Sequence, residues 1–168
     1  MKPPTAPHAR DRGFTLVEVS IVVLMLGILL LIGIPAFLDA KSNAKDRSAQ
    51  TSVRHAFANA KGIYADKDSY AAVTPATLSA SETGLVFRTG PSSEPTIVSV
   101  HSDVDGVVLA ARSDTGVCYA IGDAANPAGT VFANLGTGTC DAADAPGIPA
   151  SVPSAARAVA GGGWAQAW

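Results

Sequence analysis

The sequence contains one long segment without a charged residue, which runs from Val19 to Leu38 between Glu18 and Asp39. Most of its 20 residues are aliphatic. At a helical rise of about 1.5 Å per residue the segment extends roughly 30 Å, which is the thickness of the hydrocarbon core of a bilayer. The segment therefore predicts one membrane-spanning helix, and the rest of the chain has to fold outside the bilayer.

The residues before this segment carry a positive charge, and they predict the orientation of the helix. Among residues 1–13, three basic residues stand against one acidic residue, so this stretch has a net charge of +2. The remaining nine basic and 13 acidic residues give the rest of the chain a net charge of −4. By the positive-inside rule, residues 1–13 stay in the cytoplasm and the chain after Leu38 is exported. The acidic body also lacks the basic patch that is typical of nucleic-acid binding.

The apolar segment is expected to stay in the mature protein. A secretory signal peptide is cut after its apolar stretch, at small residues of the A-x-A type. Here the segment continues into IPAFLDAKSNAKDRS, and no such site follows within a suitable distance. We therefore expect a retained membrane helix rather than a removed signal peptide.

One carboxylate lies close to the start of this segment, in the sequence GFTLVE at residues 13–18. A charged side chain in lipid costs a few kcal/mol, so Glu18 is expected to have a neutralising partner. A cut between Gly13 and Phe14 would create a positive amino group about one helical turn away, in the same chain or in a neighbouring one. In the alternative interpretation Glu18 lies at the headgroup boundary and is solvated there.

The segment GFTLVEVSIVVLMLGILLLIGIPAF closely resembles the class III signal sequence of type IV prepilins and pseudopilins. That sequence has a short basic leader ending in glycine, then phenylalanine, a hydroxyl residue, two aliphatic residues, a glutamate and a long apolar run. The resemblance is contiguous over roughly residues 10–38. In this family a membrane-embedded aspartic peptidase cleaves after the glycine and methylates the new amino terminus.

The resemblance implies roles for four residues. Gly13 would precede the cut, and Phe14 would become the N-methylated terminus. Glu18 would act in filament assembly, and Pro35 matches a proline near which the helix breaks or loosens in filaments. The implied partners are further copies of the chain, the prepilin peptidase and methylase, the membrane platform that assembles pili, and the lipid bilayer. The chain would be a single-pass precursor in the cytoplasmic membrane and later part of a surface filament.

The sequence predicts that the helix continues beyond the bilayer. Strong helix formers dominate up to Asp68, and apolar residues recur at spacings of three and four. This stripe consists of Ala49, Val53, Ala56, Phe57, Ala60, Ile63 and Tyr64. We therefore expect one helix from about Phe14 to about Asp66, whose second half needs a packing partner.

The partner of this stripe is predicted to be a small β-sheet. After a turn-rich stretch from Ser69 to Gly84, runs rich in β-branched residues alternate with turn signals. These runs are residues 85–89, 96–101, 106–112, 117–121 and 130–134. The pattern predicts an antiparallel meander of about four strands on the helix, and thus an α+β fold.

Two cysteines, Cys118 and Cys140, lie in the distal part of the chain. Because a small exported domain folds in an oxidising compartment, we expect them to form a disulfide; two unrelated buried thiols are the alternative. The bond would join the strand at 117–121 to the chain after the last strand, and hold the loop at 122–129 against the helix. The expected organisation is a leader at 1–13, a transmembrane and assembly helix at 14–38, an exported globular domain at 39–140, and a flexible Pro/Ala/Gly-rich tail at 141–168.

No catalytic, cofactor or metal site is predicted. His8, His55 and His101 are scattered along the chain, and we expect them to be solvated. The sequence DVDG at residues 103–106 is similar to the opening of a calcium loop, but Val107 occupies the next ligand position, so we interpret it as a hairpin turn. We therefore predict a structural filament subunit, either a major or a minor pilin, and not an enzyme. A pseudopilin of a type II secretion system and a single-span, membrane-anchored binding module are the alternatives.

Overall fold

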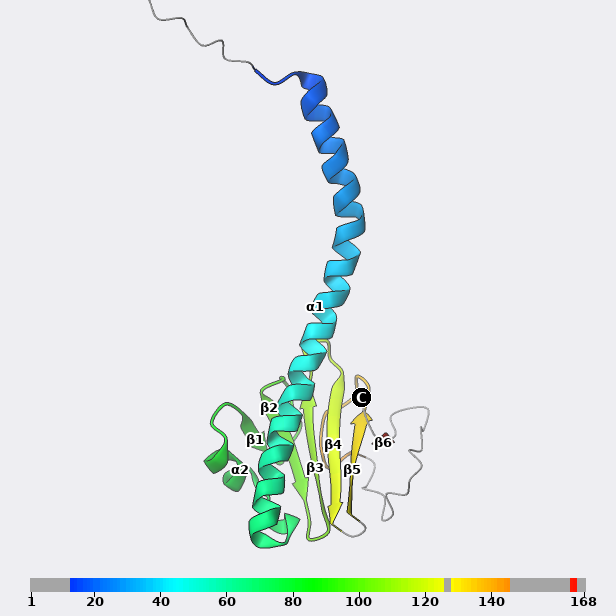
Figure 1. The fold of residues 1–168 in the computed structure, drawn as a ribbon. Coiled ribbons are helices and arrows are strands. Elements are labelled where there is room, and N and C mark those ends of the chain that lie inside the picture. Colours follow the sequence, from blue (N-terminus) through cyan, green and yellow to red (C-terminus); the bar gives the residue numbers. More distant parts are fainter. Residues whose placement is uncertain (1–12, 126–127, 146–163, 166–168) are drawn as a thin grey trace, which may run out of the picture. The chain divides into compact units, whose positions relative to one another are not determined.

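The computed structural model describes residues 13–125, 128–145 and 164–165. The chain divides into two compact units, one up to Ala40 and one from Lys41 onward, and each is described by itself. Helix α1 spans Leu16–Lys67 and contributes to both units (Figure 1). The predicted helix from about Phe14 to about Asp66 is confirmed within two residues at each end.

Helix α1 ends at Lys67 because the next residue leaves the helical conformation. Asp68 has a φ of 52°, in the left-handed region, and its N–H donates to the carbonyl of Tyr64 at 2.7 Å. A left-handed residue with this bond is a common way to end a helix. The chain then reverses and returns along the same unit.

The stretch from Ser69 to Gly84 was expected to consist of turns, and this expectation was wrong in part. It contains a 3-10 helix, η1 at Tyr70–Ala72, and a short helix, α2 at Pro75–Ser81. Thr74 caps α2, because its hydroxyl accepts the N–H of Thr77 while the Thr77 hydroxyl accepts the N–H of Thr74. Pro75 fits the first turn, where its missing N–H is not needed.

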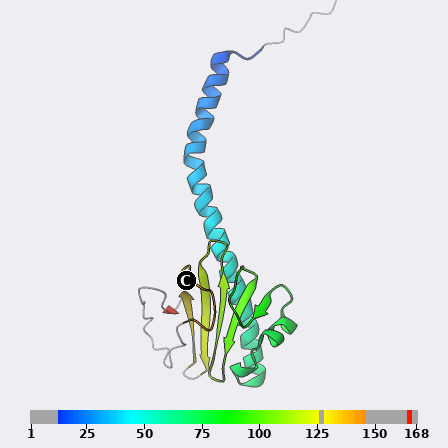
Figure 2. The ribbon, with the colours of Figure 1, turned by 180° about the vertical axis from the view of Figure 1, so that it is seen from behind.

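Six strands form one sheet in the order of the sequence (Figure 2). The strands are β1 Val86–Arg88, β2 Ile97–Ser102, β3 Gly106–Arg112, β4 Cys118–Ala125, β5 Ala128–Asn134 and β6 Trp164–Ala165. The strands from β2 to β6 pair antiparallel, which confirms the predicted meander, whereas β1 pairs with β2 in parallel. The α+β fold of a long N-terminal helix and a mainly antiparallel sheet is therefore confirmed.

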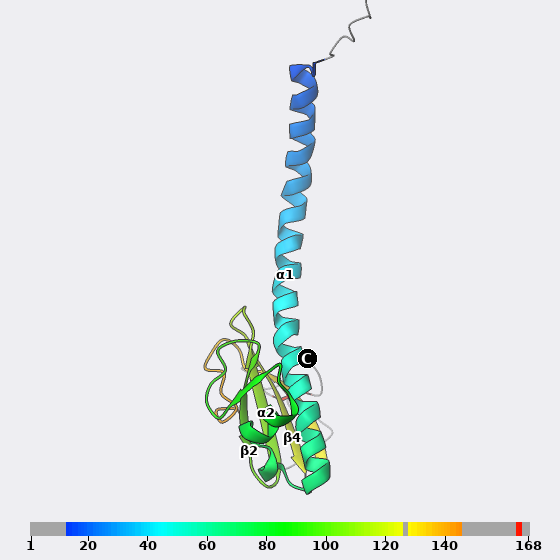
Figure 3. The same ribbon diagram turned by 90° about the vertical axis from the view of Figure 1, so that its left-hand side faces the viewer.

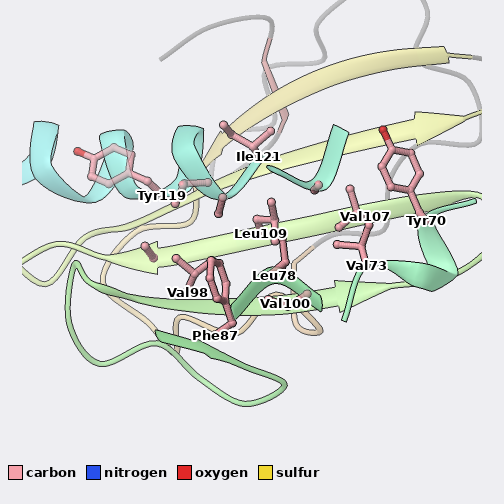
Figure 4. Close-up of a cluster of buried hydrophobic side chains, with 14 of the residues drawn as sticks. Tyr70, Val73, Leu78, Phe87, Val98, Val100, Val107, Leu109, Tyr119 and Ile121 are labelled. Atoms are coloured by element: carbon pink, nitrogen blue, oxygen red, sulfur yellow. The ribbon is translucent and has the colours of Figure 1, made fainter. Parts of the chain in front are cut away.

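The second half of α1 packs on one face of this sheet (Figure 3). The buried helix residues are Ala49, Ser52, Val53, Ala56 and Ala60, and Phe57, Ile63 and Tyr64 are partly buried beside them. All seven residues of the predicted stripe thus contact the core. Side chains of β1, β2, β3, β4, η1 and α2 also belong to the cluster, and ten of its residues are labelled in Figure 4. The small helix residues allow the helix backbone to approach the sheet closely.

The opposite face of the sheet is also covered. Val108, Ala110, Cys118, Ala120 and Val131 form a second buried cluster with residues of the segment that follows β5. Strands β3 and β4 are therefore buried on both faces along almost their whole length. The residues from Leu135 to Ala145 act as the covering layer on this face, so the beginning of the predicted tail takes part in the core. Most of residues 141–168, predicted to be a flexible tail, lie outside the described residues.

Candidate processing and assembly site

The predicted cleavage junction lies before the first turn of α1. Gly13 and Phe14 precede the helix, and the Phe14 side chain is 82% exposed. A side chain built on Gly13 would meet no atom within 4 Å. Both residues on either side of the predicted cut are therefore accessible and outside regular secondary structure.

Thr15 defines where the helix begins. Its hydroxyl Oγ1 accepts the backbone N–H of Glu18 at 3.2 Å, and its carbonyl accepts the N–H of Val19 at 3.2 Å. This is the geometry of an N-cap residue, and it places Glu18 at the third helical position. A carboxylate is favourable there because it faces the positive end of the helix dipole. The sequence analysis missed this role, although Thr-x-x-Glu is a known signal for a helix start.

The apolar part of α1 has no buried residue in its own unit. Its large side chains between Leu16 and Leu38 have exposed fractions from 48% to 86%. This helix is long and apolar enough to cross a membrane by length and composition. Helix α1 is continuous through Pro35. The predicted helix break at Pro35 concerns the assembled state and stays a prediction.

The predicted disulfide between Cys118 and Cys140 is present, and the two residues are fully buried. It joins the start of β4 to the segment after β5, as expected. Its location on the sheet differs from the prediction, because Cys118 belongs to the buried cluster on the face away from the helix. Side chains alternate along a strand, so Cys118 points away from the face that Tyr119 and Ile121 share with α1. The predicted clamp on the helix is therefore wrong, and the bond fastens the covering layer instead.

A buried carboxylate that the sequence analysis missed links the helix to the sheet. Asp123 is 1% exposed and forms an ion pair with Lys61, whose Nζ donates a hydrogen bond to the carboxylate at 2.7 Å. The hydroxyls of Tyr70 and Thr130 also donate to it. Burial and the adjacent Asp123 carboxylate raise the pKa of Tyr70 far above 10.0. The prediction that a loop begins at residue 122 was wrong, because β4 continues through Asp123 to Ala125.

A second carboxylate, which lies on the helix, accepts hydrogen bonds from the sheet side of the interface. Asp46 on α1 accepts hydrogen bonds from the hydroxyls of Ser113, at 2.6 Å, and Thr115, in the turn between β3 and β4. Partial burial raises the pKa of Asp46, but hydrogen bonds from Ser113, Thr115 and Tyr119 outweigh this effect and lower the pKa below 3.8. The two carboxylates thus fasten the second half of α1 near both of its ends.

The remaining predicted signals have structural explanations. Asp103 Oδ1 accepts the N–H groups of Asp105 and Gly106 at 2.8 and 2.7 Å, in the turn between β2 and β3. This confirms the hairpin turn predicted for residues 103–106. His55 and His101 are exposed, and His8 lies outside the described residues. Among the described residues, no three His, Cys, Asp or Glu side chains are grouped so that they could hold a metal ion.

Comparisons with known proteins found one family model and two relatives that match parts of the chain. Residues 8–34 match the family model of the prokaryotic N-terminal methylation motif. The type IV major pilin protein PilA of Myxococcus xanthus is 39% identical over 63 residues, which cover 38% of this chain and 29% of that protein. The type IV narrow pilus major component PilA5 of Thermus thermophilus is 39% identical over 61 residues, in a match that covers 32% of this chain and 53% of that protein.

The chain thus spans about a third of the first relative's length and about half of the second's. Both relatives are named as major components of type IV pili. No solved structure matches the chain at a significant level. The chain thus carries a prokaryotic N-terminal methylation motif at residues 8–34 and is similar, over part of its length, to two proteins named for type IV pili.

Proposed function

We propose that the chain is the precursor of a structural subunit of a type IV pilus-like surface filament. A prepilin peptidase cuts it after Gly13, and the new terminus at Phe14 is N-methylated. The observation that carries this proposal is an accessible junction directly before a capped helix whose apolar first half is exposed and has one carboxylate in its first turn. The match to the methylation motif supports the same cut.

Cleavage changes the electrostatics at the start of the helix. The new amino group of Phe14 is positive and lies one turn before Glu18, so each charge has a partner of opposite sign nearby. Between staggered subunits this pair satisfies both charges in a medium without water. Lipid gives membrane helices no hydrophobic drive to associate, so an ion pair of this kind sets the register of neighbouring subunits.

The exposed apolar helix has two successive environments in this proposal. In the precursor it crosses the cytoplasmic membrane, with residues 1–13 inside and the unit from Lys41 outside. In the filament the same surface packs against other copies of the chain. The exported unit has its own core, a disulfide and two carboxylate links, so it holds its fold without contacts from other subunits. The peptidase and the membrane assembly platform are the further partners.

Intact-mass analysis of the chain from sheared surface filaments tests the proposal. We expect a subunit that begins at Phe14 and carries one additional methyl group, whereas Gly13→Leu should leave uncut precursor in the membrane. Gly27→Leu is a matched control, since a side chain at either glycine meets no atom within 4 Å. A filament subunit that retains residues 1–13 would contradict the proposal. A cut chain without surface filaments would favour the pseudopilin alternative, and an uncut exported chain would favour the anchored binding module.

A further inference from the structure

We propose that Thr15 is a positioning residue for the cleavage after Gly13. Its hydroxyl fixes the start of α1 at Leu16 and so keeps the Gly13–Phe14 peptide bond outside the helix. This inference rests on the proposed processing at that bond. It assigns to Thr15 the task of presenting the bond, and none of the chemistry.

The geometry of the junction carries the inference. The Thr15 side chain accepts the N–H of Glu18 and the Thr15 carbonyl accepts the N–H of Val19, each at 3.2 Å. With these two bonds Thr15 is the last residue before the helix, and Leu16 is the first residue in it. Gly13 and Phe14 stay outside, and the Phe14 side chain is largely exposed.

A peptide bond inside a helix is a poor substrate for hydrolysis. Its neighbouring N–H and C=O groups are held in bonds to residues four positions away, and side chains surround the backbone. The helix must unwind before a peptidase can bind that segment. At a membrane unwinding is more costly than in water, because released backbone groups lack water partners in the hydrocarbon core. A helix that starts after the junction avoids this step.

The sequence offers a competing helix start upstream. Asp11 is the next residue before Thr15 of a type that caps helices well, and a helix that starts after Asp11 would include Gly13 and Phe14. Gly13 opposes that longer helix, since glycine is a weak helix former. The Thr15 hydroxyl adds to this opposition by stabilising the shorter helix.

The test compares caps of different chemistry in the full-length precursor, in membranes that contain the prepilin peptidase. Thr15→Val keeps the branched shape but removes the hydroxyl, and we expect cleavage about fivefold slower, the factor that corresponds to the loss of one N-cap. Thr15→Ser and Thr15→Asn retain a capping oxygen and should cleave within about twofold of the natural rate. Adding Asp11→Ala to Thr15→Val removes the competing start and should restore most of the rate, while Asp11→Ala alone serves as the control.

A second readout does not depend on cleavage. Backbone chemical shifts of Gly13 and Phe14 in the micelle-bound precursor should move toward helical values in Thr15→Val and return in Thr15→Asn. Normal cleavage of Thr15→Val with unchanged shifts would overturn the inference. Slow cleavage of Thr15→Asn would also overturn it, because the peptidase would then recognise the threonine hydroxyl directly and not the helix start that it sets. If the natural chain is not cut after Gly13, the proposed processing fails, and the chemical shifts alone decide whether Thr15 sets the helix start.

Discussion

Lys61 on α1 and Asp123 on β4 lie 62 positions apart in the sequence, yet their charged atoms are 2.7 Å apart. The Asp123 side chain is 1% exposed, whereas that of Lys61 is 45% exposed, so only the lysine of this pair is in contact with solvent to a large extent. The Lys61 Nζ also lies 5.7 to 6.0 Å from the ring centres of Phe57, Tyr64 and Tyr70. This contact fixes how the end of the helix docks on the sheet.

Removing either partner should destabilise the unit from Lys41 onward, but by different amounts. Asp123→Ala leaves the buried Tyr70 hydroxyl and the Lys61 ammonium without their acceptor, and we expect a loss of about 3 kcal/mol. Lys61→Met still leaves Asp123 with its two hydroxyl donors, Tyr70 and Thr130, so the loss should be smaller, about 1–2 kcal/mol. Urea unfolding of the unit from Lys41 onward measures both values.

Arg47→Met is the matched control for Lys61→Met, because Arg47 is an exposed cation on the same helix. Its effect should stay within about 0.5 kcal/mol. Equal effects of Lys61→Met and Arg47→Met would show that the ion pair adds nothing to docking.

The sequence predicted the helix and most of the sheet because those signals are local. Strong helix formers dominate from Asp39 to Asp68, and each strand from β2 to β5 lies in a run rich in β-branched residues that turn signals bound. The parallel pairing of β1 was missed, since a short strand pattern specifies no strand direction. Asp123 was taken as part of a turn because its partners Lys61 and Tyr70 are distant in the sequence. Long-range contacts of this kind leave no local pattern.

The proposed cleavage junction could be located from the sequence to a single peptide bond, because GFTLVE is itself a contiguous motif. The face that Cys118 occupies could also have been found. Successive side chains of a strand point to opposite faces of the sheet, so Tyr119 and Ile121 share one face and Cys118 lies on the other. If Tyr119 and Ile121 face the helix, Cys118 must face away from it. The sequence analysis considered the spacing of the cysteines and left their strand parity aside.

Because of Asp46, the unit from Lys41 onward should lose stability in acid. Its folded-state pKa lies below 3.8, so the unfolded chain binds a proton more readily than the folded one. The stabilisation is therefore fully present above about pH 5 and is lost as the pH falls through 3.8 toward the folded-state pKa. Asp46→Asn should lower the unfolding free energy by about 1 kcal/mol at pH 7, and this difference should vanish in acid.

Denaturant unfolding at a series of pH values checks this prediction. Asp114→Asn is the control, because Asp114 is an exposed residue in the same turn as Ser113 and Thr115. Its curve should run parallel to that of the natural chain. A constant difference between the natural chain and Asp46→Asn down to pH 3 would contradict the assigned role of the carboxylate.

The disulfide should contribute substantially to the stability of the unit from Lys41 onward. The cysteines are 22 positions apart, and the chain-entropy estimate for a loop of this length is about 3 kcal/mol. Reduction should therefore lower the melting temperature by roughly 10 °C. The reduced protein should still fold at room temperature, because Ser92 N–H to Cys140 O at 2.7 Å and Ala142 N–H to Ser99 Oγ at 2.9 Å also hold the covering layer.

Calorimetry with and without reductant measures the shift, and alkylation of the unreduced, unfolded protein counts free thiols. An unchanged melting temperature after complete reduction would mean that the hydrogen bonds of the covering layer suffice. Labelling of both cysteines before reduction would show that the exported protein does not contain the bond.

Glu18 is expected to act in assembly through its charge rather than through the helix start. Glu18→Gln keeps a polar side chain of the same length at the third helical position, where glutamine also suits a capping box, and removes only the charge. Glu18→Val removes both the charge and the polar group that suits the capping box. If the carboxylate pairs with the amino group of a neighbouring subunit, both variants should insert into the membrane at least as well as the natural chain, since a charge in lipid is removed. Both should be cut after Gly13, and both should fail to form filaments.

The amount of chain in sheared surface filaments, measured by immunoblot beside the cut fraction in membranes, gives the result. Asp39→Gln is the matched control, because Asp39 is the carboxylate at the other end of the apolar segment and should not be needed for assembly. Filaments from Glu18→Gln but not from Glu18→Val would assign the residue to the helix start, and the ion pair between subunits would then have to be abandoned. Filaments from neither variant, with normal amounts from Asp39→Gln, would place the required charge at Glu18, within one turn of the new amino terminus.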